Sequence, residues 1–169
     1  IDSLVNIANS FSEFSKMPEP NRSVFCLNEV VREVANLYEH GEKVQLNLHL
    51  PEAEFFVHSD RDQLSRVFNN LVKNAQQAIE REDGLIDLSM KIEGKEAHIQ
   101  VRDNGKGIPE DIKKKIFQPN FSTKSSGMGL GLAIVKRIIQ SSGGSIEFES
   151  TEGEGTTFYI VLPAAEKPD

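Results

Sequence analysis

Five segments of the chain alternate apolar and polar residues in the way that marks half-buried β-strands. Such a strand exposes one face to water, so its apolar face needs a second layer to cover it. Helices are predicted at 28–38, 60–82 and 132–142, but they do not alternate with the strands as regular βαβ units. This order favours an α+β two-layer sandwich over a doubly wound sheet. The predicted strands are 44–50, 85–92, 97–103, 145–150 and 156–163.

Local signals mark the ends of several elements. Asp60 is a good N-cap for the long helix that follows it. Pro109 suits the first position of a short helix at 109–117. Gly94 predicts the turn of a hairpin between two of the strands, and residues 121–131 read as a loop rich in Ser and Gly.

The first 22 residues differ from the rest. Residues 1–15 carry apolar side chains at heptad-like spacing, which fits either the seam of a coiled coil or bundle, or a helix packed on its own domain. Two prolines in 16–21 indicate a linker. We therefore divide the chain into this helix and linker (1–22), a main domain (23–163) and a tail (164–169).

Composition narrows the functional classes. A net charge of -7 argues against a general nucleic-acid binder, which needs excess Lys and Arg for phosphate contacts. The lone cysteine, Cys26, rules out an internal disulfide and favours a reducing compartment, so we expect a cytoplasmic location. No apolar run is long enough for a membrane span, and we expect no membrane contact by this segment. Because an amphipathic pattern is under way at Ile1, we interpret the chain as part of a longer protein, one that could itself be anchored to a membrane.

Two polar clusters suggest ligand chemistry, although each has a plain structural alternative. Asn70 and Asn74 lie on one face of the long helix, beside Lys73. An amide oxygen is a neutral, hard ligand that suits Mg²⁺, but taken alone the pair is better explained by caps or bonds to nearby backbone. Asp103 ends a strand, where a carboxylate can accept from an exocyclic amine, and Gly105 and Gly107 follow it; the same segment could be a simple Asn-Gly turn.

Two further clusters lie nearer the C-terminus. Gly127, Gly129 and Gly131 directly precede an apolar helix, and their amides with the helix N-terminus favour anion binding over a flexible linker. A Rossmann motif is excluded because a loop precedes the glycines and position 132 is Leu. Thr156, after Gly155, could hydrogen-bond a ligand or only start a strand.

Together, in this order, the clusters resemble the ATP-binding catalytic domain of bacterial two-component sensor histidine kinases, in the GHKL superfamily. "NNLVKNAQQA" resembles the N box, "DNGKGIP" the first glycine box, "IFQPNFSTK" the F box, "GMGLGLAIVK" the second glycine box and "GTTF" the last element. The resemblance covers about residues 24–163, and "FSEFSKMPEPNRSVFCLNEVV" is similar to the junction after the second dimerisation helix in nitrogen-regulation-type kinases.

The resemblance implies a Bergerat-type sandwich, with about three helices on one face of a mixed, mostly antiparallel sheet of about five strands. It implies ATP and Mg²⁺ as ligands. Asn74 would coordinate the metal, Asp103 would accept from adenine N6, and Asn70, Lys73 and Lys124 would act near the phosphates. The remaining implied nucleotide-site residues are Gly105, Gly107, Phe117, Phe121, Gly127, Gly129, Gly131, Leu132 and Thr156.

Asn70 also bears on the type of reaction. In the ATPase branch of the superfamily this position holds a Glu that activates water, which an amide cannot do. The resemblance therefore implies a kinase that transfers the γ-phosphoryl group to a histidine, and then to a response regulator. None of His40, His49, His58 and His98 has the family's acceptor context, so we expect the acceptor on an upstream dimerisation domain of a homodimeric protein, and no autophosphorylation by this chain alone. The competing interpretations are a water-splitting ATPase, a serine kinase of the anti-sigma type and a docking module without activity.

Overall fold

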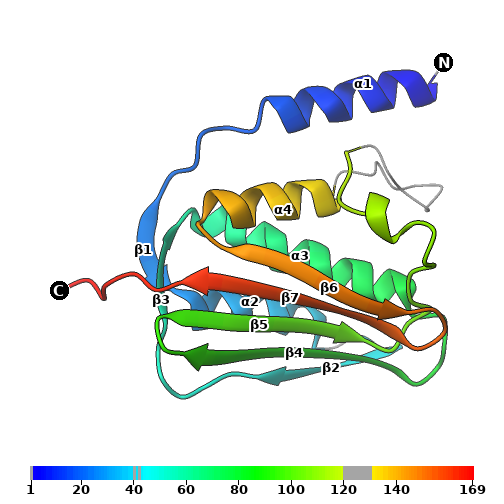
Figure 1. The fold of residues 1–169 in the computed structure, drawn as a ribbon. Helices are drawn as coiled ribbons and strands as arrows, with labels where there is room; N and C mark the ends of the chain where they lie inside the picture. The colour runs from blue at the N-terminus through cyan, green and yellow to red at the C-terminus, as the bar shows by residue number, and fades with distance from the viewer. Residues whose placement is uncertain (1, 40, 42, 120–130) are drawn as a thin grey trace.

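A five-stranded sheet forms one layer of the computed structural model, which describes residues 2–39, 41, 43–119 and 131–169 (Figure 1). Its strands are β2 (Val44–His49), β4 (Gly84–Glu93), β5 (Glu96–Asp103), β6 (Ser145–Thr151) and β7 (Gly155–Pro163). They lie in the order β2-β4-β5-β7-β6. β2 and β4 are parallel and the other neighbours antiparallel, which confirms the mixed, mostly antiparallel sheet.

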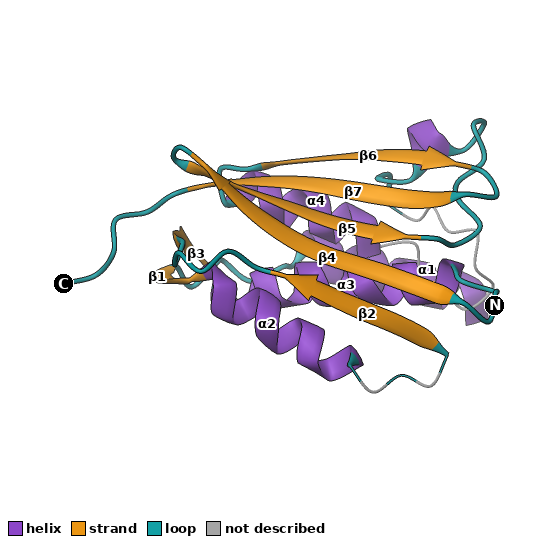
Figure 2. Ribbon diagram, turned by 90° about the horizontal axis from the view of Figure 1, so that it is seen from below, coloured by secondary structure: helices purple, strands orange, loops and turns teal. Residues whose placement is uncertain are grey.

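Three helices form the second layer and cover one face of this sheet (Figure 2). They are α2 (Leu27–Tyr38), α3 (Arg61–Ala78) and α4 (Gly131–Ser141). The fold is therefore the expected two-layer α/β sandwich. The other face of the sheet is open, because no helix among the described residues lies on it.

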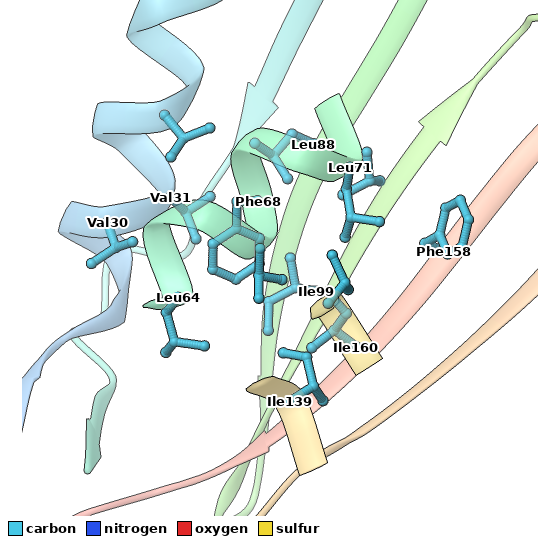
Figure 3. Packing of buried hydrophobic residues seen from close by; sticks show 14 of the residues in the cluster. Val30, Val31, Leu64, Phe68, Leu71, Leu88, Ile99, Ile139, Phe158 and Ile160 are labelled. Carbon is cyan, nitrogen blue, oxygen red and sulfur yellow. The ribbon is translucent and has the colours of Figure 1, made fainter. Parts of the chain in front are cut away.

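The core lies between the two layers, with α3 at its centre (Figure 3). Phe68 of α3 is fully buried, and so are Leu88 of β4 and Ile99 of β5. Burying an aromatic or aliphatic side chain of this size contributes about 1.5–3 kcal/mol. The strands alternate buried and more exposed positions, as predicted, since only one of their faces meets the helices.

A second, two-stranded sheet was not predicted from the sequence. β1 (Ser23–Cys26) pairs antiparallel with β3 (Phe56–Ser59). Four residues are too few to show a clear alternation, and the partner strand lies about thirty positions away in the chain. Asn28, which is buried, accepts from the Phe55 amide at 2.9 Å and donates to the Ala53 carbonyl at 2.9 Å, so it holds the loop before β3 in place.

The long helix begins as predicted but ends earlier. Asp60 caps α3 by accepting from the Gln63 amide at 3.0 Å. The expected end near residue 82 is wrong, because Ile79 is already extended, with φ -91° and ψ 113°. The Ala78 carbonyl instead accepts from the backbone of Lys106 at 2.8 Å. A loop far along the chain thus meets the backbone where the helix stops.

The short helix expected at 109–117 is also largely wrong. The segment makes successive turns with one short 3₁₀ helix, Lys113–Lys115. Its hydrogen bonds span three residues, from Ile112 to Pro109 at 3.2 Å and from Lys115 to Ile112 at 2.9 Å. So short a segment gains little from α-helix formation alone, and here Ile116 packs into the core.

The first helix, α1 (Asp2–Ser15), lies beside α4 (Figure 1). Phe14 and Met17 pack against the core, whereas Leu4 and Phe11 are exposed. The C-terminal end of this segment therefore packs on the domain, while apolar side chains nearer its start are exposed to solvent. Among the described residues, no helix combines the length and the apolar character that crossing a membrane requires.

Candidate functional site

Two buried polar residues lie opposite each other at one end of the sheet. Asp103 is the last residue of β5, and its register partner on β7 is Thr156. Each is only 6% exposed. The other buried polar side chains in the described part of the chain have structural partners: Asn28 bonds to the backbone before β3, and Ser59 to the Ser142 hydroxyl after α4. Asp103 and Thr156 are therefore the candidate pair for ligand binding.

The surroundings of Asp103 favour a carboxylate that accepts hydrogen bonds. The Gly105 amide donates to its Oδ1 at 2.8 Å. Burial raises the pKa of Asp103, and hydrogen bonds from the backbone of Gly105 and Thr156 partly oppose this rise. A carboxylate that gives up solvation in this way can use its remaining acceptor capacity for a donor on a ligand.

The glycines after Asp103 let the backbone pass close to neighbouring elements. A Cβ on Gly105 would lie 2.6 Å from the Ala78 carbonyl oxygen. Gly107 has φ +71°, and a Cβ there would lie 2.2 Å from the carbonyl oxygen of Thr151. These contacts require glycine, because any side chain would displace the loop from α3 or from β6.

The expected amide pair lies on the part of α3 that approaches this loop. Asn74 is one turn before Ala78 and Asn70 two turns before it, and both are half-buried. At a rise of 1.5 Å per residue, about 6 Å of helix separates Asn74 from the Lys106–Ala78 hydrogen bond. Lys73 is exposed on the same helix. The C-terminal half of α3, which carries these three residues, therefore ends at the same edge of the molecule as β5, whose last residue is Asp103 (Figure 1).

Part of the expected phosphate site lies beyond what the structure describes. Gly131 and Leu132 begin α4, at the same edge of the molecule as the ends of α3 and β5 (Figure 1). Phe117 packs edge-on against Phe148, with ring centroids 5.8 Å apart, and Lys136 lies 5.2 Å from its ring. Phe121, Lys124, Gly127 and Gly129 lie outside the described residues.

Sequence reasoning missed two residues that organise this end of the sheet. Asn104 accepts from the Leu85 amide at 2.8 Å and donates to the Asp83 carbonyl at 2.9 Å, which fixes the loop to the start of β4. The Ser150 hydroxyl contacts the Ile108 amide and the Thr156 hydroxyl, each at 2.8 Å. The Asn-Gly dipeptide was a signal for Asn104, but nothing in the sequence pairs Ser150 with a loop 42 residues away.

The arrangement suits a planar base with an exocyclic amine beside Asp103, and a phosphate chain running towards α3 and α4. Amide oxygens of Asn70 and Asn74 can serve as neutral ligands of a hard cation. Among the described residues, no group of three or more His, Cys, Asp or Glu could hold a metal ion. The two amide oxygens suit Mg²⁺ that takes most of its ligands from phosphates and water.

A hollow of about 470 Å³ lies elsewhere, where β2 stops and β4 continues. It is lined by His49–Pro51 and Ser89–Glu93, and none of the expected site residues is among them. Asp103 is at the other end of the sheet. We therefore assign the site from the buried polar pair and not from this hollow.

Comparisons with known proteins place the chain among similar sequences and folds. Residues 59–166 match the family described as histidine kinase-, DNA gyrase B-, and HSP90-like ATPase. The chain is 36% identical to sensor histidine kinase ZraS of Salmonella typhimurium over 166 residues, which are 96% of this chain and 36% of ZraS. It is 33% identical to sensory histidine kinase/phosphatase NtrB of Rhizobium leguminosarum bv. phaseoli, over 97% of this chain and 47% of NtrB.

A solved structure of histidine kinase ThkA in complex with the response regulator TrrA has the same fold. Its TM-score is 0.78 at 30% identity, with 97% of this chain and 48% of that chain covered. The chain thus spans between about a third and a half of these relatives. The similarity to NtrB agrees with the predicted likeness to nitrogen-regulation-type kinases.

Proposed function

The chain belongs to the family of histidine kinase-, DNA gyrase B-, and HSP90-like ATPases, as the catalytic domain of a sensor histidine kinase, and we propose that it binds Mg-ATP and donates the γ-phosphoryl group to a histidine on a dimerisation domain of the same protein. The observation that carries the proposal is the buried pair Asp103 and Thr156, set beside a glycine loop that is bonded to the end of α3.

Adenine is the part of ATP that this pair would recognise. Asp103 accepts from the N6 amine, and Thr156 contributes a hydroxyl beside it, directly or through water. Gly105 and Gly107 have no side chains, so the loop leaves room for the base next to the carboxylate. A ligand without the amine leaves the buried Asp103 without its partner, and that loss is costly in a desolvated site.

The triphosphate would lie between α3 and the start of α4. Asn74 ligates Mg²⁺, Asn70 and Lys73 contact metal or phosphate, and the helix N-terminus at Gly131 and Leu132 favours anions. Phe117 lies next to this nucleotide site. Phe121, Lys124, Gly127 and Gly129, outside the described residues, are proposed to complete the contacts with the nucleotide.

Asn70 makes transfer to histidine the expected reaction instead of rapid hydrolysis. An amide does not take a proton from water, so no general base faces the γ-phosphate from this position. An imidazole nitrogen needs no such base: it attacks the γ-phosphorus, the bond to the bridging oxygen breaks and ADP leaves with that oxygen. The protein contributes mainly positioning and charge stabilisation.

Two of the histidines that the structure describes, His98 and His49, are poorly placed as acceptors. His98 lies on the uncovered face of the sheet with Glu96 at 3.4 Å and Glu93 at 3.7 Å. His49 lies 4.0 Å from Asp87, and His58 is exposed on β3. Carboxylates beside a ring repel the γ-phosphate. His40 is outside the described residues. We therefore assign the acceptor to the dimerisation domain of a homodimeric, cytoplasmically acting kinase, with a response regulator as the next acceptor.

Calorimetric titration with ADP, with and without Mg²⁺, tests the nucleotide site. We expect binding in both conditions and tighter binding with Mg²⁺. Incubation with γ-labelled ATP should leave this chain unlabelled and release phosphate slowly, whereas label should appear on a protein that also carries the dimerisation helices. Stable label on one of the four histidines, or rapid hydrolysis, would contradict the proposal.

A further inference from the structure

The hydroxyl of Ser150 joins two segments of the candidate site. Ser150 lies on β6, directly opposite Thr156 of β7, and is half-buried. Its Oγ is 2.8 Å from the Ile108 amide, 2.8 Å from the Thr156 hydroxyl and 3.1 Å from the Gly155 carbonyl. It thus contacts both the loop that follows Asp103 and the strand that carries the other buried polar residue.

The contacts of Ser150 limit the hydrogen bonds that the Thr156 hydroxyl can make. The Ile108 amide must donate, so it occupies one lone pair of the Ser150 oxygen. If the serine proton goes to Gly155, Thr156 donates to Ser150 and presents only lone pairs to a ligand. If the serine proton goes to Thr156, the threonine proton remains available. In either case the direction of the Ser150 hydroxyl proton sets whether the Thr156 hydroxyl can donate to a ligand or only accept from it.

Ser150 also belongs to a clamp on the glycine loop. On the α3 side, the Lys106 amide donates to the Ala78 carbonyl. On the β6 side, the Ile108 amide donates to the Ser150 hydroxyl, and the Gly153 amide donates to the Lys106 carbonyl at 2.7 Å. The Lys113 ammonium donates to the Ser150 carbonyl at 2.6 Å. The position of the glycine loop beside Asp103 and Thr156 therefore depends on β6 as well as on α3.

From this geometry we infer that Ser150 is a positioning residue for purine recognition: it orients the Thr156 hydroxyl and fixes the loop next to Asp103. It acts through these groups without touching the base. The inference rests on the proposed function, because it takes Thr156 and Asp103 as the groups that face the purine.

Calorimetry on Ser150→Ala and Ser150→Thr tests this role, with Ser145→Ala as a matched control at an exposed position of the same strand. The ligands are ADP and inosine diphosphate, which carries a carbonyl in place of the amine. We expect Ser150→Ala to weaken ADP binding about tenfold, as loss of one hydrogen bond implies, and to reduce the preference for ADP over inosine diphosphate. Ser150→Thr keeps the hydroxyl and should restore both, and Ser145→Ala should resemble the wild type.

The outcomes separate this inference from the proposed function. If the wild-type chain does not bind ADP, both fail. If it binds ADP and Ser150→Ala binds equally well, only the role of Ser150 fails. If both Ser150 variants lose affinity for the two nucleotides equally, together with a lower unfolding temperature, Ser150 is merely structural and the inference is overturned.

Discussion

The backbone amide of Lys106 donates to the carbonyl of Ala78 at 2.8 Å, which bonds the glycine loop of the site to the last residue of α3. Through this contact the loop that follows Asp103 and the helix that carries Asn74 share one rigid junction. The two halves of the proposed nucleotide site are therefore positioned by the same hydrogen bond, and changes at the junction should affect both.

Gly105→Ala should disturb this junction. Its new Cβ would lie 2.6 Å from the Ala78 oxygen and 2.8 Å from Oδ1 of Asp103, so backbone must move. We expect a loss of about 1–3 kcal/mol in the free energy of unfolding, as for other overpacked sites, together with weaker ADP binding. Urea unfolding measures the first. Gly131→Ala, where no atom of the described residues lies within 4 Å of the Cβ, is the stability control and should be neutral or slightly stabilising. Equal stability of the two variants would contradict the close contact.

Asp103→Asn should separate binding from stability. Loss of a charge-assisted hydrogen bond is expected to weaken ADP binding by roughly 10- to 100-fold. Because burial raises the pKa of Asp103 in the folded state, that state binds more protons than the unfolded one, and stability falls as pH rises from the unfolded value of 3.8 through the folded pKa.

The Asp103→Asn variant lacks this titration. It should be at least as stable as the wild type at neutral pH, and its stability should fall less as the pH rises from 3.8 towards neutral. Urea unfolding across this range is the measurement, with Asp111→Asn, at an exposed site, as control. A variant that is less stable at neutral pH would show that the hydrogen bonds to the carboxylate outweigh the cost of burying its charge.

Asn74→Ala should remove the part of ADP affinity that depends on Mg²⁺. We expect the variant to bind ADP in Mg²⁺ no more tightly than the wild type does in a chelator. Asn69→Ala is the matched control, since Asn69 lies on the same helix and instead accepts from the Tyr38 hydroxyl. It could cost about 1 kcal/mol of stability, but the effect of Mg²⁺ should persist. A persistent Mg²⁺ effect in Asn74→Ala would exclude Asn74 as the metal ligand.

Arg137→Ala should release α1 from the domain. The Arg137 guanidinium donates to the Phe14 carbonyl and lies 5.2 Å from the Phe14 ring. A contact of this cation–π type contributes about 0.5–1 kcal/mol at an exposed site. We expect faster amide exchange in residues 2–15 and unchanged exchange in β5 and β7. Arg32→Ala, an exposed change on α2, should leave α1 unaffected. Equal exchange of α1 in both variants would show that Arg137 does not hold it.

The local pattern of the sequence was sufficient for most elements and for the layer arrangement. Alternation predicted five strands, and the strands form one mixed sheet whose apolar face meets three helices. Asp60 was predicted as an N-cap because that role needs only a neighbour three residues away. Asp103 could also be identified as a site candidate, although its segment alone fitted a simple Asn-Gly turn and only the order of the clusters singled it out.

Tertiary contacts decided what the local pattern could not. α3 stops at Ala78 because a loop near residue 106 bonds to it, and 109–117 forms turns that pack Ile116 into the core. Strands β1 and β3 exist because they pair with each other. Ser150 gains its place in the site only when β6 lies beside β7 and next to the loop at Ile108. The common reason is range: propensity, capping and alternation act between residues a few positions apart, whereas these features depend on partners about thirty or more positions away.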